Sequence, residues 1–372
     1  MKKGITSFFG YHQPMEENIK QIKNAGFDRV MCATDTKYEK QNGTLDSQVN
    51  LIKKYGLELG SLHAKYDEDI AEMFFEEGET GEKITKDFMD DILLCEKYGF
   101  TCLVMHIYGK PSEVGAERFS RIVKFAKEHN VILAVENLID LAPFDYLLER
   151  FTDENVKVCL DIGHRNCFSR DNIVYEKYGD RIITTHLHDN DGLYDLHTTT
   201  LLAKNPDTKT KYPDSKVYQT SRQNVNFDEF VECVKKYNLD IALDYELNNN
   251  IMGCDKISPE DMLRQCYTEA KELGRKIFRH TNKLNYCIET TNDWLSAYAW
   301  DTDFFAVYNY AEKKWVPASE SLSSYFHDYP DTIKEIDESE AEKITNGILP
   351  YDDYERYIDF FGEVFKKRKK NK

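Results

Sequence analysis

Acidic and imidazole side chains recur near the C-terminal ends of short apolar segments in this sequence. They are found in the stretches LELGSLHA, TCLVMHI, VILAVEN, VKVCLDIGH, IITTHLHD and IALDYEL. The residues at these positions are His63, His106, Glu136, Asp161, His164, His186, His188, Asp189 and Glu246. Charged and imidazole side chains are uncommon inside apolar segments unless they are paired or functional. Each one alone is compatible with a structural role, but their repetition at equivalent positions indicates one shared site.

Together these side chains offer carboxylate oxygens and imidazole nitrogens, which are common ligands of divalent metals. A ring of Glu, Asp, His and Glu suits Mn²⁺, Mg²⁺, Co²⁺, Zn²⁺ or Fe²⁺ without choosing among them, and the number of histidines favours a transition metal. Asp195 and His197, in the stretch YDLH, are separated by one residue and would face the same side of an extended backbone. This pair is therefore a candidate for a second or third metal site.

The elements that must position these residues alternate regularly up to about residue 273. Eight apolar segments separated by helical patterns cover residues 4–9, 29–34, 57–64, 101–107, 131–137, 156–164, 182–189 and 241–247. This alternation predicts a parallel sheet, and the count of eight favours a (β/α)8 TIM barrel of the α/β class. A doubly wound open sheet is less favoured, because no glycine-rich phosphate loop follows the first segment. In a barrel, the carboxyl ends of all strands meet on one face.

The pattern changes after Gly274. Residues 275–372 contain all three Trp residues and period-two stretches such as LSAYAW and FFAVYNY, with AEKKWVPA as a possible hairpin arm. Helices are expected in DESEAEKITNGI and in YDDYERYIDFFGEVFKKRKK. We therefore expect a barrel over residues 1–274 and a small α+β appendage of unassigned role over 275–372. The longest connection within the barrel, residues 190–226, follows the seventh segment and would lie over the catalytic face.

Composition narrows the classes of partner and compartment. The chain has 66 acidic and 49 basic residues, a formal net charge of -17, which opposes binding to nucleic acid or an anionic membrane. Its nine Cys residues form no C-x-x-C motif and include several in apolar runs, as expected of reduced thiols in a cytoplasmic protein. No apolar run approaches the ~18 residues of a membrane span, and the N-terminal stretch lacks the apolar region of a signal peptide.

The motifs AVEN, LDIGH and HLHDNDG, the DLH that follows, and a Glu on the last strand resemble the xylose-isomerase-like barrel superfamily. That superfamily includes sugar-phosphate isomerases and epimerases and the apurinic endonucleases of the type IV class. The resemblance covers residues 1–273 and leaves out the appendage. Its motifs are specific for the superfamily and much less so for one reaction.

Resemblance to the ketose epimerases implies a single divalent metal held by Glu136, Asp161, His186 and Glu246. The two glutamates would then act from opposite faces as proton acceptor and donor at the carbon next to the carbonyl. Substrate-binding roles would fall to His164 and His188, and Asp195 and His197 are further candidates. One departure is that several such epimerases have an Arg shortly after the metal-binding His, where this chain has DNDGLYD. The predicted function is a metal-dependent isomerase or epimerase of a sugar or sugar phosphate.

Two other functions remain open. Resemblance to the apurinic endonucleases implies a three-zinc cluster, and all its ligand positions are filled here, by His63, His106, Glu136, Asp161, His164, His186, Asp195, His197 and Glu246. The net charge of -17 and the lack of a basic, aromatic-interleaved patch after the first three strands oppose this phosphodiesterase alternative. A non-catalytic barrel that binds a metal and a carbohydrate is the third possibility, with the appendage as an interaction module. A homo-oligomer is compatible with all three.

Overall fold

The computed structural model describes most of the chain, which consists of two compact units. The described residues are 1–34, 43–65, 67, 70–170, 173–205, 207, 209–212, 214, 216–217, 219–253, 256–281, 284–299, 304–318 and 332–353. One unit comprises Lys2–Lys271, and the other comprises Glu272–Lys372 together with Met1.

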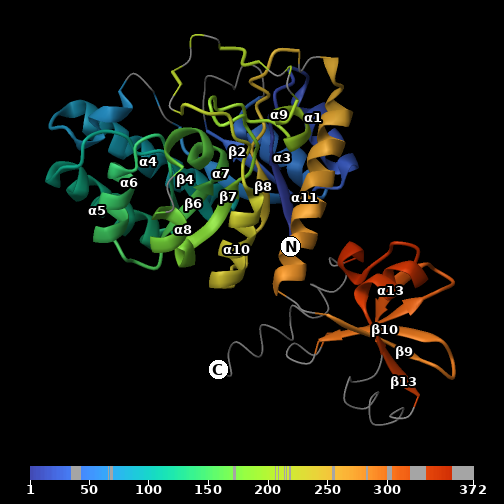
Figure 1. The fold of residues 1–372 in the computed structure, drawn as a ribbon. Helices are drawn as coiled ribbons and strands as arrows, with labels where there is room; N and C mark the ends of the chain where they lie inside the picture. The colour runs from blue at the N-terminus through green and yellow to red at the C-terminus, as the bar shows by residue number, and fades with distance from the viewer. Residues whose placement is uncertain are drawn as a thin grey trace. The chain divides into compact units, whose positions relative to one another are not determined.

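The first unit is built on eight parallel strands (Figure 1). They are β1 (Lys3–Thr6), β2 (Arg29–Ala33), β3 (Glu58–His63), β4 (Cys102–Met105), β5 (Ile132–Glu136), β6 (Val156–Asp161), β7 (Ile182–His186) and β8 (Leu243–Tyr245). Their order in the sheet is β7-β6-β5-β4-β3-β2-β1-β8. Just beyond β7, the Leu187 amide donates to Asp244 O at 2.8 Å, and Leu187 O accepts from the Glu246 amide at 3.0 Å. These bonds close the ring and, with the C-terminal sheet, confirm the predicted TIM barrel with an appendage.

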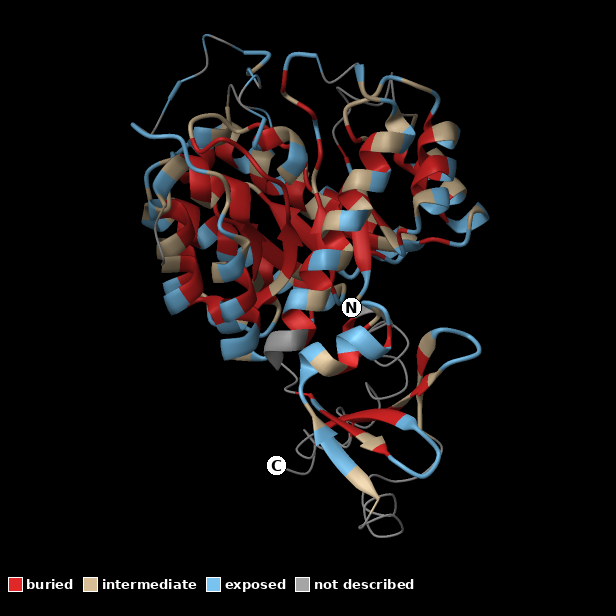
Figure 2. Ribbon diagram, turned by 45° about the vertical axis from the view of Figure 1, so that its right-hand side comes forward, coloured by how far each residue is buried: buried red, intermediate tan, exposed pale blue. Residues whose placement is uncertain are grey.

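Helices follow most strands of the barrel and cover its outside (Figure 1). The longer ones are α1 (Met15–Ala25), α3 (Leu45–Lys54), α4 (Glu79–Tyr98), α5 (Glu113–Glu128), α6 (Ala142–Arg150), α10 (Phe227–Tyr237) and α11 (Pro259–Thr281). Gly26 and Gly99 end α1 and α4 with φ of 105° and 90°, the left-handed conformation that glycine adopts without strain. The strands are largely buried, and the exposed residues lie mainly on the outer faces of the helices (Figure 2).

All eight strands end before their apolar segments do, and two of these early ends change where predicted site residues lie. The stretch LDIGH was expected to be extended throughout, but β6 ends at Asp161, and Ile162–His164 form a helical turn, α7. Asp161 causes this turn because its Oδ1 accepts a hydrogen bond from the His164 amide at 2.6 Å, as an N-cap residue does. Strand β7 likewise ends at His186, so His188 and Asp189 lie beyond the regular sheet.

The second unit contains an antiparallel sheet of five strands in the order β12-β11-β10-β9-β13. They are β9 (Asn285–Glu289), β10 (Trp294–Ala299), β11 (Phe304–Asn309), β12 (Lys314–Pro317) and β13 (Ile333–Ile336), followed by α13 (Glu338–Ile344). Its core is rich in aromatic side chains, including Tyr286, Phe304, Tyr308 and Trp315. A terminal helix was predicted from residue 351 onward, but all of this segment after residue 353 lies outside the described residues.

Candidate metal centre

The deepest donor group lies at the ends of consecutive strands on one side of the barrel. Glu136 ends β5, Asp161 ends β6, His186 ends β7, and Glu246 follows β8. One potential ligand atom from each of the four lies within 4.8 Å of the others. His186 Nδ1 is 3.1 Å from Glu136 Oε2 and 3.0 Å from Glu246 Oε2. Parallel strands in register therefore bring together the four residues that the sequence predicted as ligands of one metal.

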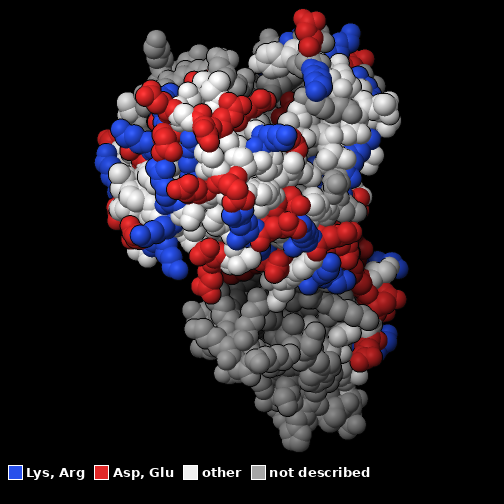
Figure 3. All heavy atoms as spheres, turned by 90° about the vertical axis from the view of Figure 1, so that its left-hand side faces the viewer, with Lys and Arg blue, Asp and Glu red and all other residues white. Residues whose placement is uncertain are grey.

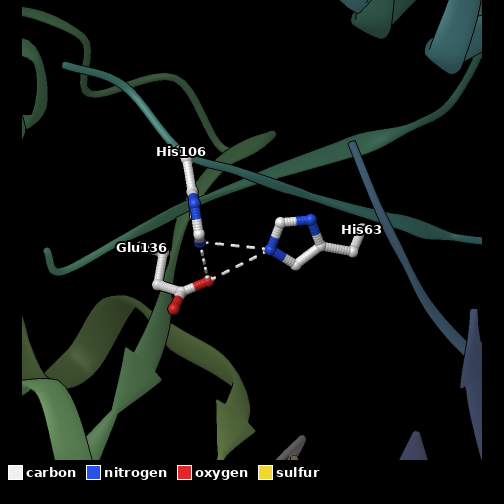
Figure 4. A group of neighbouring side chains, drawn as sticks. All are labelled: His63, His106 and Glu136. Carbon is white, nitrogen blue, oxygen red and sulfur yellow. Dashed lines mark hydrogen bonds and ion pairs between the residues drawn. The ribbon is translucent and has the colours of Figure 1, made fainter. Parts of the chain in front are cut away.

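A second group shares Glu136 with the first. In Figure 4, the side chains of His63 and His106, from the ends of β3 and β4, point toward the carboxylate of Glu136. His106 Nε2 lies 3.1 Å from Glu136 Oε2 and 3.1 Å from His63 Nε2. The distance from His63 Nε2 to Glu136 Oε2 is 3.7 Å. His186 Nδ1 contacts the same oxygen, Glu136 Oε2, at 3.1 Å. Glu136 therefore belongs to both groups and could supply a ligand to either.

The third group consists of His164, Asp195 and His197. Asp195 Oδ2 is 2.7 Å from His197 Nε2 and 3.3 Å from His164 Nε2. Asp195 and His197 reach the barrel mouth because an antiparallel bridge between Asp189 and Thr198 folds the connection after β7 back on itself. The carbonyl of His197 then accepts from the amides of residues 248 and 249, each at 3.0 Å, which ties this loop to the end of β8.

His188 differs from the other predicted substrate-binding residues. Its side chain is fully buried, and its Nε2 lies 3.1 Å and 3.2 Å from the two carboxylate oxygens of Asp161. Its ring stacks on that of His197, with centroids 3.9 Å apart. His164, Asp195 and His197 line the cavity described below, whereas His188 lies behind Asp161 and supports it.

Cys159 was interpreted from the sequence as an ordinary buried thiol, yet it lies within ligand range of the centre. Glu136, Cys159 and His186 form a fourth group whose candidate ligand atoms lie within 4.8 Å of one another. Cys159 is two residues before Asp161 on β6, so both side chains face the same side of the strand. Burial raises the pKa of this thiol, which keeps it protonated unless a cation binds nearby. The period-two relation to Asp161 is the sequence signal that could have identified it.

The carboxylates of the centre are stabilised in their ionised form. Burial by itself raises the pKa of Glu136, but the positive charge of His186 and the interactions with His106 and His164 outweigh burial and hold it well below its usual range. The same competition between burial and imidazole charge lowers the pKa of Asp195, beside His197 and His164. It also lowers the pKa of Glu246. Negative charge is therefore retained where a cation would bind.

The imidazoles respond to the same interactions. Burial disfavours protonated His164, but Asp161 and Asp195 raise its pKa well above the usual value. For His197, burial is likewise outweighed by Asp195, and the pKa rises to about 9. His106 differs, because burial prevails over the attraction of Glu136 and its pKa is lowered. Protons on His164 and His197 compensate the carboxylates, and a divalent cation bound to the same atoms would replace those protons.

The hydrogen bonding of the donors also fits a metal. Among the described residues, Glu136 Oε1, His186 Nδ1 and Asp195 Oδ1 are buried side-chain atoms without a hydrogen bond of acceptable geometry. Buried polar atoms nearly always have a partner, so converging atoms that do not bond to each other require an explanation. Mixed carboxylate and imidazole ligands suit a divalent transition metal. One ion at the deep group would satisfy Glu136 and His186, and another at the His164, Asp195 and His197 group would satisfy Asp195.

A cavity of about 360 Å³ opens over the donor groups. Its lining includes donors from all four groups, namely His63, His106, His164, His186, Asp195, His197 and Glu246. Polar residues such as Ser7 and Gln48 and apolar residues such as Phe8, Tyr108 and Phe168 complete the wall. This volume falls within the range of roughly 300–1,000 Å³ that is typical of small-molecule sites.

The distribution of charge on the barrel surface bears on whether it could bind a polyanion such as nucleic acid. On the face of the barrel shown in Figure 3, basic and acidic side chains are interspersed. Within the described residues, none of the helices combines the length and apolarity that a bilayer span requires.

Comparisons with known proteins agree with this architecture. The model of a family described as xylose isomerase-like TIM barrel matches residues 19–265. A D-tagatose 3-epimerase-like protein is similar in structure with a TM-score of 0.54 and 17% identity, over 76% of this chain and 98% of that one. A D-psicose 3-epimerase with D-tagatose from Clostridium cellulolyticum H10 has a TM-score of 0.53 and 14% identity, over 74% and 99%. The IOLI protein with a binding zinc atom has a TM-score of 0.52 and 14% identity, over 75% and 99%.

One curated relative matches a short part of the sequence. An uncharacterized protein of Sinorhizobium fredii is 39% identical over 77 residues, which are 19% of this chain and 25% of that protein. The match thus spans about a quarter of the relative's length. The solved structures share only 14–17% sequence identity with this chain, so their similarity establishes the fold alone.

Proposed function

The chain belongs to the xylose isomerase-like TIM barrel family, and we propose that it is a divalent-metal-dependent isomerase or epimerase of a sugar or sugar phosphate. The observation that carries the proposal is the placement of two carboxylates, Glu136 and Glu246, at 3.1 Å and 3.0 Å from Nδ1 of His186, next to a cavity of small-molecule size that Glu246 and His186 line. Pure binding of a sugar does not require two opposed carboxylates, whereas moving a proton from one face of a carbon to the other does.

In the proposed reaction, the residues of the centre would bind the metal, transfer the proton and bind the substrate. Glu136, Asp161, His186 and Glu246 would hold a divalent ion, which when bound supplies a Lewis acid that polarises a carbonyl. One glutamate would accept the proton from the carbon next to that carbonyl, and the other would donate a proton to the opposite face. His164, Asp195 and His197, which line the cavity, would bind hydroxyl groups and orient the substrate. Ketoses are suitable first substrates, since one structural neighbour is described as an epimerase with D-tagatose.

A multi-metal phosphoester hydrolase is the second candidate, because a single-metal isomerase needs only one of the donor groups. The His63, His106 and Glu136 group and the His164, Asp195 and His197 group offer two further sites. Two or three ions this close together would clamp a phosphate and activate water. The formal net charge of -17 makes a small phosphoester a better substrate for such a site than DNA.

Metal stoichiometry separates the two candidates. We would measure metal per chain by elemental analysis in the wild type and in His63→Ala, with His129→Ala as the control, since His129 pairs with Glu96 away from the centre. One ion per chain, unchanged in His63→Ala, would support the isomerase. Two or three ions, fewer in His63→Ala alone, would favour the hydrolase. A protein that bound no metal under any loading condition would contradict both and favour a non-catalytic barrel.

Turnover tests the isomerase chemistry itself. Once a ketose substrate is identified, Glu246→Gln should abolish its conversion into the epimer, measured by NMR, because inversion needs both glutamates. Conversion at the wild-type rate in this variant would refute the two-glutamate mechanism.

A further inference from the structure

Asn137 lies between two of the donor groups, in the motif AVEN, and the proposed chemistry gives it no role. Strands β5 and β6 pair in parallel register up to Glu136 and Cys159. Beyond this point, the side chain of Asn137 forms the hydrogen bonds to β6 that the backbone of β5 no longer forms. Its Nδ2 donates to Asp161 O at 2.7 Å, and its Oδ1 accepts from the Asp161 amide at 2.8 Å. A side-chain amide thus satisfies both backbone groups of a candidate ligand.

The backbone of Asn137 contacts a second donor. Its carbonyl oxygen lies 3.1 Å from His164 Nδ1. Nδ1 also lies 3.2 Å from Glu136 Oε1. Carbonyl and carboxylate oxygens can only accept, so both contacts favour a proton on Nδ1. The other ring nitrogen, Nε2, faces Asp195 Oδ2 at 3.3 Å. A neutral His164 with its proton on Nδ1 would direct the lone pair of Nε2 toward the third donor group, as metal-binding histidines commonly do.

We propose that Asn137 is a positioning residue that holds Asp161, from the deep group, and His164, from the group at the cavity wall, in ligand geometry. Its side chain is almost fully buried, so these hydrogen bonds are shielded from water. One residue at the end of β5 thereby couples two metal sites. The inference rests on the proposed metal centre and is independent of whether the substrate is a sugar or a phosphoester.

Zinc affinity provides the first test. The full-length protein would be stripped of metal and titrated with Zn²⁺ in competition with a chromophoric chelator. Loss of a supporting hydrogen bond around a ligand typically weakens metal affinity by about 10- to 100-fold. We expect Asn137→Ala to show this loss at the deep site, which contains Asp161, because only the hydrogen bonds to Asp161 use the Asn137 side chain. The backbone carbonyl that contacts His164 remains in the variant, so the His164 site should lose less, and the His63 and His106 site should lose nothing.

Asn155→Ala is the matched control, because Asn155 precedes the opposite end of β6 and donates from Nδ2 to Val123 O at 3.1 Å. It should bind zinc as the wild type does. A folded Asn137→Ala protein with wild-type affinity at every site would overturn the positioning role. An equal loss in both variants would also overturn it, because the effect would then reflect general destabilisation of β6.

A second measurement needs no variant and remains available if Asn137→Ala does not fold. In the zinc-loaded wild type labelled with ¹⁵N-histidine, NMR should show the proton of His164 on Nδ1. A proton on Nε2 would overturn the proposal. A wild type that bound no zinc would overturn both the metal centre and the role of Asn137, whereas normal zinc binding without sugar turnover would count against the isomerase alone.

Discussion

Two regions of this protein bury polar side chains, and they satisfy them differently. In the C-terminal unit, Trp315 Nε1 donates to Ile348 O at 3.0 Å. The buried carboxylate of Glu289 accepts from the amides of Thr291 and Asn292, each at 2.9 Å. Within residues 284–299, 304–318 and 332–353, no buried side-chain nitrogen or oxygen of the described residues lacks a hydrogen bond. These polar groups complete one another, as the polar groups of a structural core should.

At the mouth of the barrel, by contrast, several buried polar atoms lack a hydrogen bond. Glu136, His186 and Asp195 each place a buried atom toward its neighbours without a hydrogen bond of acceptable geometry. Such an arrangement costs stability unless something else satisfies the atoms. Buried polar atoms that converge without bonding to one another therefore indicate a ligand site, whereas those that bond to one another indicate support of the fold.

Glu136→Gln should have the largest effect on function. Glu136 belongs to every donor group except the one formed by His164, Asp195 and His197. The amide keeps the shape but removes the charge that a cation needs, so we expect loss of metal and a fall in kcat of at least about 10²-fold. Elemental analysis and steady-state kinetics would measure these effects.

Glu289→Gln is the control for this prediction, because it changes a buried glutamate of the other region in the same way. It should retain the metal content and kcat of the wild type. Equal losses in the two variants would remove the distinction between the regions.

Trp315→Ala should produce the reverse result, with a large loss of stability and no loss of metal. Trp315 is fully buried and packs against Tyr308, with ring centroids 5.4 Å apart, and against Tyr286. Truncating a buried Trp to Ala typically costs about 3–5 kcal/mol in the free energy of unfolding. Urea unfolding of the full chain would measure this cost.

Trp294→Ala supplies the comparison, since 40% of Trp294 is exposed. Its free energy of unfolding should stay close to that of the wild type. If Trp315→Ala also lost metal from the barrel, the two regions would not be energetically separate.

The barrel and the gathering of its strand-end ligands were predictable, because both depend on local patterns. Each apolar segment carries its ionisable residue near the same end, and the parallel arrangement of strands then brings those ends together. The family assignment depended on the same segments. Where the sequence misled, as in LDIGH, the cause was one side chain, since the capping bond of Asp161 converts the expected strand end into a helical turn.

Asn137, Cys159 and His188 show what sequence patterns could not reveal. The hydrogen bonds of Asn137 depend on the register of β5 with β6, and nothing near it in sequence distinguishes it from any Asn after a strand. Cys159 looks like other thiols in apolar runs until His186 is placed beside it. His188 was predicted to bind substrate, but it lies beyond the end of β7 and contacts the carboxylate of Asp161 instead. The roles of all three residues depend on contacts between segments that are distant in the sequence.

A smaller effect should distinguish the donor carboxylates from a buried barrel carboxylate outside the donor groups. Asp91, on α4, accepts from the Lys65 amide at 3.1 Å. Burial raises the pKa of Asp91 from 3.8 to about 6, only partly opposed by its hydrogen bonds and by the charge of Lys65. The folded state therefore keeps a proton that the unfolded chain releases. The resulting stability is fully present below pH 3.8 and is lost as the pH rises through about 6.

Asp91→Asn removes this titration while keeping an acceptor for the Lys65 amide. Each pKa unit corresponds to about 1.4 kcal/mol, so the free energy of unfolding of the variant should gain up to about 3 kcal/mol on the wild type between pH 4 and pH 7. Urea titrations of metal-free protein at both pH values would measure the gain, with Asp90→Asn, exposed on the same helix, as the control. A difference that did not change with pH would mean that Asp91, like the donor carboxylates, is held ionised by its neighbours, and burial alone would no longer separate structural from ligand-binding carboxylates in this barrel.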